Sequence, residues 1–179
     1  MNEYTILKRE PQYKGKIFDV EKVTLRLPDQ REATYDLVNH KNAVTILPID
    51  TQRQIWFVKQ YRLGIQKEIL ELPAGVFNEG EDQLTAAGRE LREEIGMTAE
   101  ILRPIGEGVM SPGYATEYMY YFLASELSKD PLPQDDDEFI EVVKIPLEKV
   151  YEMVYKGEII DNKSLAALLY AIPFLGPLQ

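Results

Sequence analysis

Cysteine is absent from this 179-residue sequence, and histidine occurs once, at His40. Without cysteine the chain can form no disulfide, no thiolate metal site and no thiol nucleophile. A single histidine has no second histidine with which to bind a metal, and His40 follows a strand-like segment. We therefore expect a hydrogen-bonded structural role for His40 and look to carboxylates for metal chemistry.

Positive charge is also scarce, because 20 Lys and Arg residues stand against 30 Asp and Glu residues, for a formal net charge of −10. Binding to nucleic acid or to an anionic membrane needs clustered positive charge, so the sequence predicts neither partner. No segment approaches the ~18 apolar residues of a membrane span. The charged N-terminus lacks the apolar core of a signal peptide, and we expect a cytoplasmic protein.

Carboxylates at helical spacing are the most informative feature that is present. Glu90, Glu93 and Glu94 are three and four residues apart, so a helix would place them on one side. Like charges at this spacing destabilise a helix by roughly 0.2–0.5 kcal/mol per pair. A hard divalent cation would turn that cost into binding, because such ions prefer carboxylate oxygens.

Signals for one amphipathic helix surround these glutamates. Asp82 is the expected N-cap, and Gly96 stands where helices commonly close in the left-handed conformation. Small and apolar residues at helical spacing predict a buried stripe made of Leu84, Ala87 (or Gly88), Leu91 and Ile95.

Residues 75–97 match the pattern G-x5-E-x7-R-E-U-x-E-E-x-G-U, where U is an aliphatic residue, and the chain therefore resembles the Nudix family. The matching positions are Gly75, Glu81, Arg89, Glu90, Leu91, Glu93, Glu94, Gly96 and Met97. The resemblance implies an α+β protein, an α/β/α sandwich with a mixed β-sheet between helices.

Short β-rich runs dominate the rest of the chain, at 17–27, 33–38, 43–49, 55–61, 69–72, 101–109, 117–123 and 139–145, with helices expected at 147–156 and 162–171. Residues 1–40 form a strand-rich segment that is too short to bury its own core, and residues 41–179 form the Nudix domain. In one branch of the family, the ADP-ribose pyrophosphatases and nucleotide-sugar hydrolases, the N-terminal strands usually exchange across a homodimer, and the resemblance implies the same here.

Four further segments resemble those of this branch, the ADP-ribose pyrophosphatases and nucleotide-sugar hydrolases: SPG at 111–113, QYR at 60–62, ELPAG at 71–75 and DDDEFIEV at 135–142. The resemblance implies hydrolysis of the pyrophosphate bond in a nucleoside diphosphate linked to a sugar, with ADP-ribose giving AMP and ribose 5-phosphate. A GDP-mannose or UDP-glucose type of substrate is the alternative, because Tyr35 stands where many ADP-ribose enzymes carry Arg. A non-catalytic nucleotide sensor is a further alternative, although every carboxylate of the pattern is present.

By the same resemblance, Glu90 and Glu94 hold Mg²⁺ or Mn²⁺ together with the Ala74 carbonyl. Glu93 binds a second ion or its water, and two or more ions are expected. Arg89 pins the glutamates by ion pairing, for which its planar fork is suited. Pro73 and Gly75 interrupt the backbone on either side of Ala74. We therefore expect that the Ala74 carbonyl forms no hydrogen bond within a sheet and is free to bind a metal.

The general base is expected in the late acidic loop, where relatives carry Glu-x-Glu and this chain has Asp136 and Glu138. Because the aspartate is shorter, Glu138 is the candidate base or further metal ligand. A loop that is merely solvated is the alternative. The predicted substrate contacts are Arg62 on the phosphates (or in a surface ion pair), Tyr35 on the base, Gly113 and Glu117 on the sugar side, and Phe18 and Glu71.

Overall fold

A computed structural model of the chain describes residues 3–134 and 139–176. The chain forms two compact units. One contains the N-terminal residues through Asn42 together with Gly108–Tyr118, and the other contains Ala43–Glu107 and the C-terminal part from Met119. From the sequence we expected the boundary between the two units at residue 40, and we did not expect Gly108–Tyr118 to belong to the first unit.

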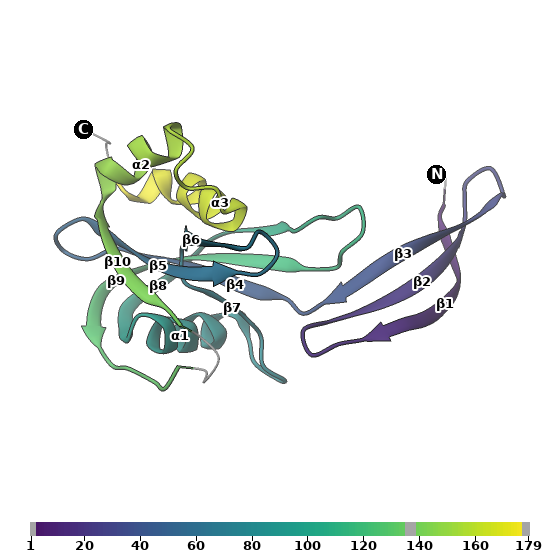
Figure 1. Cartoon of the computed structure of the whole chain (residues 1–179), viewed down its shortest axis with the longest axis horizontal. Helices are drawn as coiled ribbons and strands as arrows, with labels where there is room; N and C mark the ends of the chain where they lie inside the picture. Colours follow the sequence, from purple (N-terminus) through teal and green to yellow (C-terminus); the bar gives the residue numbers. More distant parts are fainter. Residues whose placement is uncertain (1–2, 135–138, 177–179) are drawn as a thin grey trace. The chain divides into compact units, whose positions relative to one another are not determined.

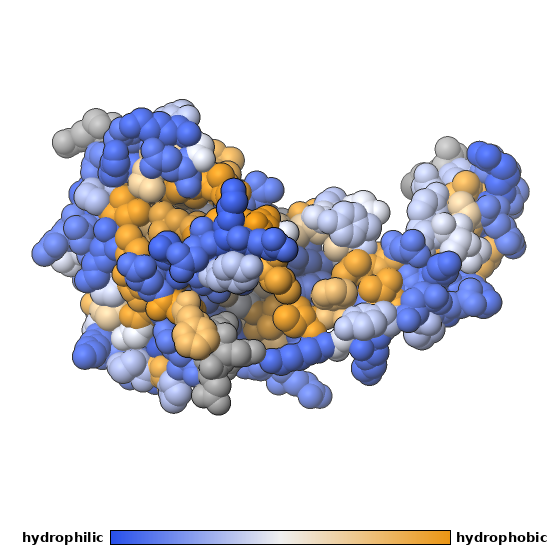
Figure 2. Space-filling view, viewed as in Figure 1, coloured by the Kyte–Doolittle hydropathy of each residue, from blue (hydrophilic) through white to orange (hydrophobic). Residues whose placement is uncertain are grey.

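The first unit is an antiparallel sheet of β1 (Thr5–Lys14), β2 (Phe18–Arg26) and β3 (Glu32–His40), in that order. The strand-rich N-terminus is thus confirmed. Among the described residues of this unit, only one hydrophobic side chain, that of Val23, is buried. Several aromatic and aliphatic side chains are exposed at its surface (Figure 2). Its stability therefore owes little to a core of its own.

The segment Gly108–Tyr118 belongs to this unit because it pairs with the end of β3. The Val38 N–H donates to the Tyr114 carbonyl at 2.8 Å, and the Thr116 N–H donates to the Val38 carbonyl at 3.0 Å. The backbone N–H of His40 also donates to the Thr116 hydroxyl at 3.0 Å. No sequence pattern links residues so far apart. The His40 ring is hydrogen-bonded, as expected, since its Nδ1 lies 2.7 Å from the Lys41 carbonyl oxygen.

The second unit contains two sheets. Their strand orders are β7-β4-β9-β8 and β10-β5-β6, and the pairing is parallel between β4 and β9 but antiparallel elsewhere among the registered pairs. The strands are β4 (Ala43–Pro48), β5 (Gln54–Arg62), β6 (Lys67–Glu71), β7 (Ala74–Val76), β8 (Met97–Val109), β9 (Tyr118–Lys129) and β10 (Glu141–Pro146).

Helices cover both sides of these sheets, with α1 on one side and α2 and α3 on the other (Figure 1). Their bounds are α1 (Gln83–Glu94), α2 (Leu147–Tyr155) and α3 (Asn162–Ala171), followed by the 3₁₀ turn η1 (Ile172–Phe174). Both α1 and α3 contact β4. The expected α/β/α arrangement with a mixed sheet is confirmed. None of the helices in the described residues has the length and apolar character needed to cross a membrane.

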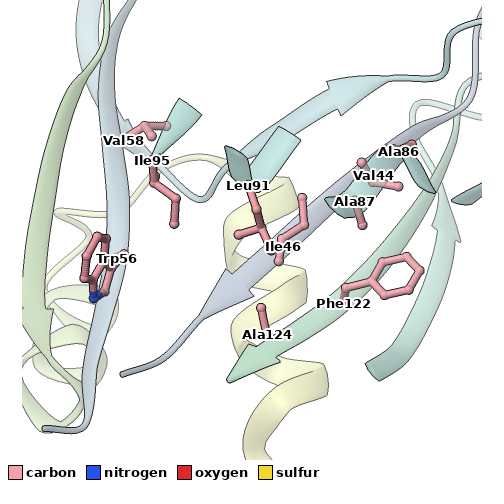
Figure 3. Close-up of a cluster of buried hydrophobic side chains, with 10 residues drawn as sticks. All are labelled: Val44, Ile46, Trp56, Val58, Ala86, Ala87, Leu91, Ile95, Phe122 and Ala124. Atoms are coloured by element: carbon pink, nitrogen blue, oxygen red, sulfur yellow. The ribbon is translucent and has the colours of Figure 1, made fainter. Parts of the chain in front are cut away.

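Strand β4 lies at the centre of the unit, because all six of its residues are buried. A strand covered on both faces needs apolar side chains along its whole length, which Val44, Ile46 and Leu47 provide. Figure 3 shows the cluster in which Val44 and Ile46 lie beside Leu91 of α1 and Phe122 of β9. This packing fixes α1 against the sheet.

The ends of α1 form as the sequence predicts. The Asp82 carboxylate accepts the Thr85 N–H at 2.8 Å, and Gly96 has a φ of +70°. The predicted buried stripe is wrong at Leu84, whose side chain is 51% exposed. Periodicity fixes the side of the helix on which a residue lies, but not whether a strand extends far enough to cover the first turn.

Candidate active site

The three glutamates of α1 lie on the edge of its buried face. Glu90 is 8% exposed and Glu94 is 2% exposed, and the Glu93 side chain is 25% exposed. Carboxylates are almost never so buried unless they are paired or bind a metal. Their burial requires compensating positive charge or hydrogen-bond donors nearby.

Arg89 supplies part of that compensation with every donor it has. Its Nε and Nη2 donate to the two oxygens of Glu81, each at 2.9 Å. Its Nη1 donates to Glu90 at 2.6 Å and to Glu93 at 2.7 Å, and Nη2 also donates to the Val76 carbonyl at 3.0 Å. A guanidinium has five N–H donors, so Arg89 has none left for a substrate.

These contacts shift the ionisation of both partners. The hydrogen bonds from Arg89 hold the pKa of Glu81 below its usual value, against a smaller opposing effect of burial. The hydrogen bonds to Glu81 likewise raise the pKa of Arg89. Arg89 therefore stays charged and orients the glutamates, as the resemblance implied. The sequence analysis did not predict the contact between Glu81 and Arg89. The signal that could have revealed it is that both residues are fixed positions of the Nudix pattern.

Strand β7 brings the backbone of Ala74 and Gly75 against these carboxylates. The Ala74 N–H donates to Glu94 at 3.0 Å. A Cβ atom on Gly75 would lie 1.8 Å from a Glu90 oxygen, which explains the glycine as a site of close approach. Ala74 stands opposite Thr45 of β4 in the register, but its N–H points to Glu94, and the neighbouring Ile46 N–H donates to the Pro73 carbonyl at 2.8 Å. Every second residue of an antiparallel strand points its N–H and C=O away from the partner strand, which is consistent with the expectation that the Ala74 carbonyl lies outside sheet pairing.

Negative charge remains in excess in this cluster. Three carboxylates, those of Glu81, Glu90 and Glu93, share the one charge of Arg89, which leaves two negative charges, and Glu94 lies beside them. Across the described parts of the chain, no three His, Asp or Glu side chains converge as a ready-made metal site. Each carboxylate still has two oxygens with several lone pairs. This buried set of hard oxygen donors fits Mg²⁺ or Mn²⁺.

A second ionic cluster lies at the ends of β5 and β6. The Arg62 Nε and Nη2 donate to the two oxygens of Glu71 at 2.6 and 2.5 Å, and the Glu71 side chain is only 1% exposed. Burial raises the pKa of Glu71, but the hydrogen bond from Arg62 and the charge of Lys163 outweigh it and lower the pKa overall. This geometry favours a holding role for Glu71 over direct substrate contact.

Helix α3 contributes residues to this cluster that sequence reasoning missed. Lys163 donates to Glu71 and, at 2.9 Å, pairs with Asp161. Asp161 caps α3 by accepting the Ser164 N–H at 3.0 Å, and the Ser164 hydroxyl accepts the Leu72 N–H at 2.7 Å. The Asp-x-x-Ser spacing signals an N-cap, but nothing in the sequence links it to residues ninety positions earlier.

The other predicted substrate contacts belong to the first unit. Phe18 of β2 and Tyr35 of β3 are 43% and 50% exposed. Gly113 has open space around it, and the Glu117 carboxylate lies 3.8 Å from His40 Nδ1. Phe18 also borders a cavity of about 330 Å³, whose polar lining includes Lys14, Lys16, Asn39 and Lys41. Glu138 and Asp136 lie outside the described residues.

Comparison with known proteins agrees with this geometry. The NUDIX domain model matches residues 39–168. The chain is 37% identical to an ADP-ribose pyrophosphatase of Bacillus subtilis, covering 95% of this chain and 92% of the relative. It is 31% identical to a methanol dehydrogenase activator of Bacillus methanolicus, covering 94% and 92%.

A crystal structure of an ADP compounds hydrolase superposes with a TM-score of 0.88 at 26% identity, covering 97% of this chain and 94% of that one. The Nudix fold is therefore shared along nearly the full length of both chains. Nudix hydrolases generally depend on divalent metal ions, which fits the glutamates of α1 and their excess charge. The chain belongs to the NUDIX family.

Proposed function

We propose that this Nudix pyrophosphohydrolase cleaves the pyrophosphate bond of ADP-ribose to give AMP and ribose 5-phosphate. The observation that carries the proposal is the set of buried glutamates on α1, which holds more negative charge than Arg89 neutralises. The likeness to an ADP-ribose pyrophosphatase over 95% of the chain supports the choice of substrate.

Each residue of the cluster has a distinct task in this proposal. Glu90, Glu94 and the Ala74 carbonyl would hold Mg²⁺, with Mn²⁺ as a substitute, and Glu93 would bind a second ion or its water. Bound ions supply charge neutralisation for the diphosphate and lower the pKa of a water. Arg89 keeps the carboxylates aligned. In the reaction, a water oxygen bonds to one phosphorus, the bridging P–O bond breaks, and the water proton passes to a base.

Arg62 is the proposed contact to the substrate's phosphates. Its side chain is 43% exposed although it is anchored on Glu71. The hydrogen bond to Glu71 raises the pKa of Arg62, and the charges of Glu71 and Glu94 add to the effect. Arg62 thus lies within electrostatic range of a proposed metal ligand. Tyr35 and Phe18 are proposed for the base, and Gly113 and Glu117 for the sugar side.

The direct test is an assay of the purified protein with ADP-ribose, GDP-mannose, UDP-glucose and NADH, each with Mg²⁺ and with Mn²⁺. We expect the highest kcat/KM for ADP-ribose, with AMP and ribose 5-phosphate as products. A preference for GDP-mannose or UDP-glucose would favour the alternative raised by Tyr35. Nucleotide binding without hydrolysis of any of them would instead indicate a sensor.

Glu138 is proposed as the general base on the strength of the resemblance. Glu138→Gln should then lower kcat by about 10²-fold, as removal of a general base does, while KM changes little. Steady-state assays across pH would check this, because the variant should also lose the acidic limb of the kcat profile. Turnover like that of the unmodified protein would rule the role out.

A homodimer and a cytoplasmic location are also proposed. The first unit exposes Ile6 and Tyr13 of β1, and Tyr4 just before it, and buries few hydrophobic side chains among its described residues. Pairing with a second copy would cover such a surface. Light scattering should give about twice the chain mass of 20.6 kDa, and a monomer would contradict the proposal.

A further inference from the structure

The buried carboxylate of Glu71 brings two cations together. Arg62 Nη2 and Lys163 both donate to the same oxygen, Glu71 Oε2. Two hydrogen bonds to one atom keep the two nitrogens within about 6 Å of each other. Arg62 comes from β5 and Lys163 from α3, so two segments a hundred residues apart meet at one anion.

Both cations keep donors that the cluster does not use. In the described parts of the chain, Arg62 commits its Nε and Nη2 to Glu71, while no hydrogen bond is formed by its Nη1. Lys163 has three donors, of which one is donated to Glu71, and its ammonium group also forms an ion pair with Asp161. Arg89 contrasts with them, since all five of its donors are satisfied by the protein.

The cluster also adjoins the proposed metal ligands. Glu71 is three residues before Ala74, whose N–H donates to Glu94. The connecting Leu72 N–H is held by Ser164 of α3 at 2.7 Å. The negative charge of Glu94 contributes to the raised pKa of Arg62. An anion held by the metal ligands would therefore lie close to the unused donors.

We infer that Lys163 is a substrate-binding residue, which with Arg62 forms a two-cation clamp for a phosphate of the substrate, while Glu71 positions both cations. This inference rests on the proposed hydrolysis of a nucleoside diphosphate compound. Guanidinium and ammonium groups are the donors that bind phosphate most strongly. Glu71 and Asp161 together balance the charges of Arg62 and Lys163, so the phosphate would be bound by the donors that remain unused and not by unmatched positive charge.

Two variants on neighbouring residues separate binding from mere support of the fold. Lys163→Met removes the ammonium group and keeps most of the stem, and it should raise KM for ADP-ribose about 10-fold, since a hydrogen bond to a charged group is lost. The kcat should stay within about threefold. Asp161→Asn removes a neighbouring negative charge and still caps α3. That variant should leave KM unchanged or lower it.

If Lys163 only stabilises the fold, both variants break the same network and both raise KM, which would overturn the inference. An unchanged KM in Lys163→Met would also overturn it. If Lys163→Met does not fold, Asp161→Asn decides alone, because a tenfold higher KM there contradicts an electrostatic role. Lys163→Arg should keep KM within a few-fold of the original value.

The matched control is Lys149→Met on α2, which removes the same charge from a surface pair with Glu152 and should leave KM unchanged. Urea unfolding of each variant reports stability separately. Failure of the unmodified protein to hydrolyse any phosphoanhydride would refute the proposed function. Normal hydrolysis with no effect at Lys163 would refute only the clamp.

Discussion

Replacing Glu94 with glutamine is expected to lower kcat for ADP-ribose hydrolysis by on the order of 10³-fold at saturating Mg²⁺. Residues that merely orient metal ligands typically cost 10–100-fold when mutated, and a ligand itself should cost more. Glutamine matches glutamate in shape but removes one negative charge from a side chain that is 2% exposed. The Ala74 N–H would still find an oxygen acceptor at this position, so the backbone of β7 should stay in place.

Two measurements make this result interpretable. Titration with Mn²⁺, followed by electron paramagnetic resonance, should show weaker or fewer bound ions in Glu94→Gln. The control Glu148→Gln removes the same charge from α2, where the carboxylate pairs with Arg53 at 3.5 Å and is half-exposed, and it should behave like the unmodified protein. Undiminished hydrolysis by Glu94→Gln would leave the proposed metal site without support.

Gly75→Ala is expected to lower kcat by more than 10²-fold although it adds only one methyl group. The added Cβ would lie 1.8 Å from a Glu90 oxygen and 2.1 Å from its carboxyl carbon, whereas ordinary contacts lie at 3.4–4 Å. Either Glu90 or β7 must therefore move by more than an ångström. A displacement of about 1 Å at a reacting centre can cost 10²-fold, and Glu90 is also held by Arg89 at 2.6 Å.

Gly88→Ala on α1 provides the matched control, because an added Cβ there meets nothing within 4 Å. It should leave kcat unchanged and raise the free energy of unfolding by up to about 1 kcal/mol, since alanine is the better helix former. The pair of variants is compared by steady-state kinetics and urea unfolding. Full activity in Gly75→Ala would mean that the position of Glu90 is not critical.

Local features of α1 were predictable because their causes are local. The Asp82 cap depends on a residue three positions away, and Gly96 closes the helix through its own backbone freedom. The burial of Leu84 was predicted wrongly. It depends on which other parts of the chain cover the first turn of α1, which periodicity does not contain.

The amino-acid sequence by itself determined which side of α1 carries Glu90, Glu93 and Glu94, because helical spacing converts sequence separation into a shared face. It also determined the family, through a pattern confined to residues 75–97. Only the tertiary structure decided that Gly75 touches Glu90 and that Arg62 and Lys163 share one oxygen of Glu71. The first contact depends on how β7 packs against α1. The second joins segments far apart in the chain, and only the packing of β5, β6 and α3 brings them within hydrogen-bonding distance.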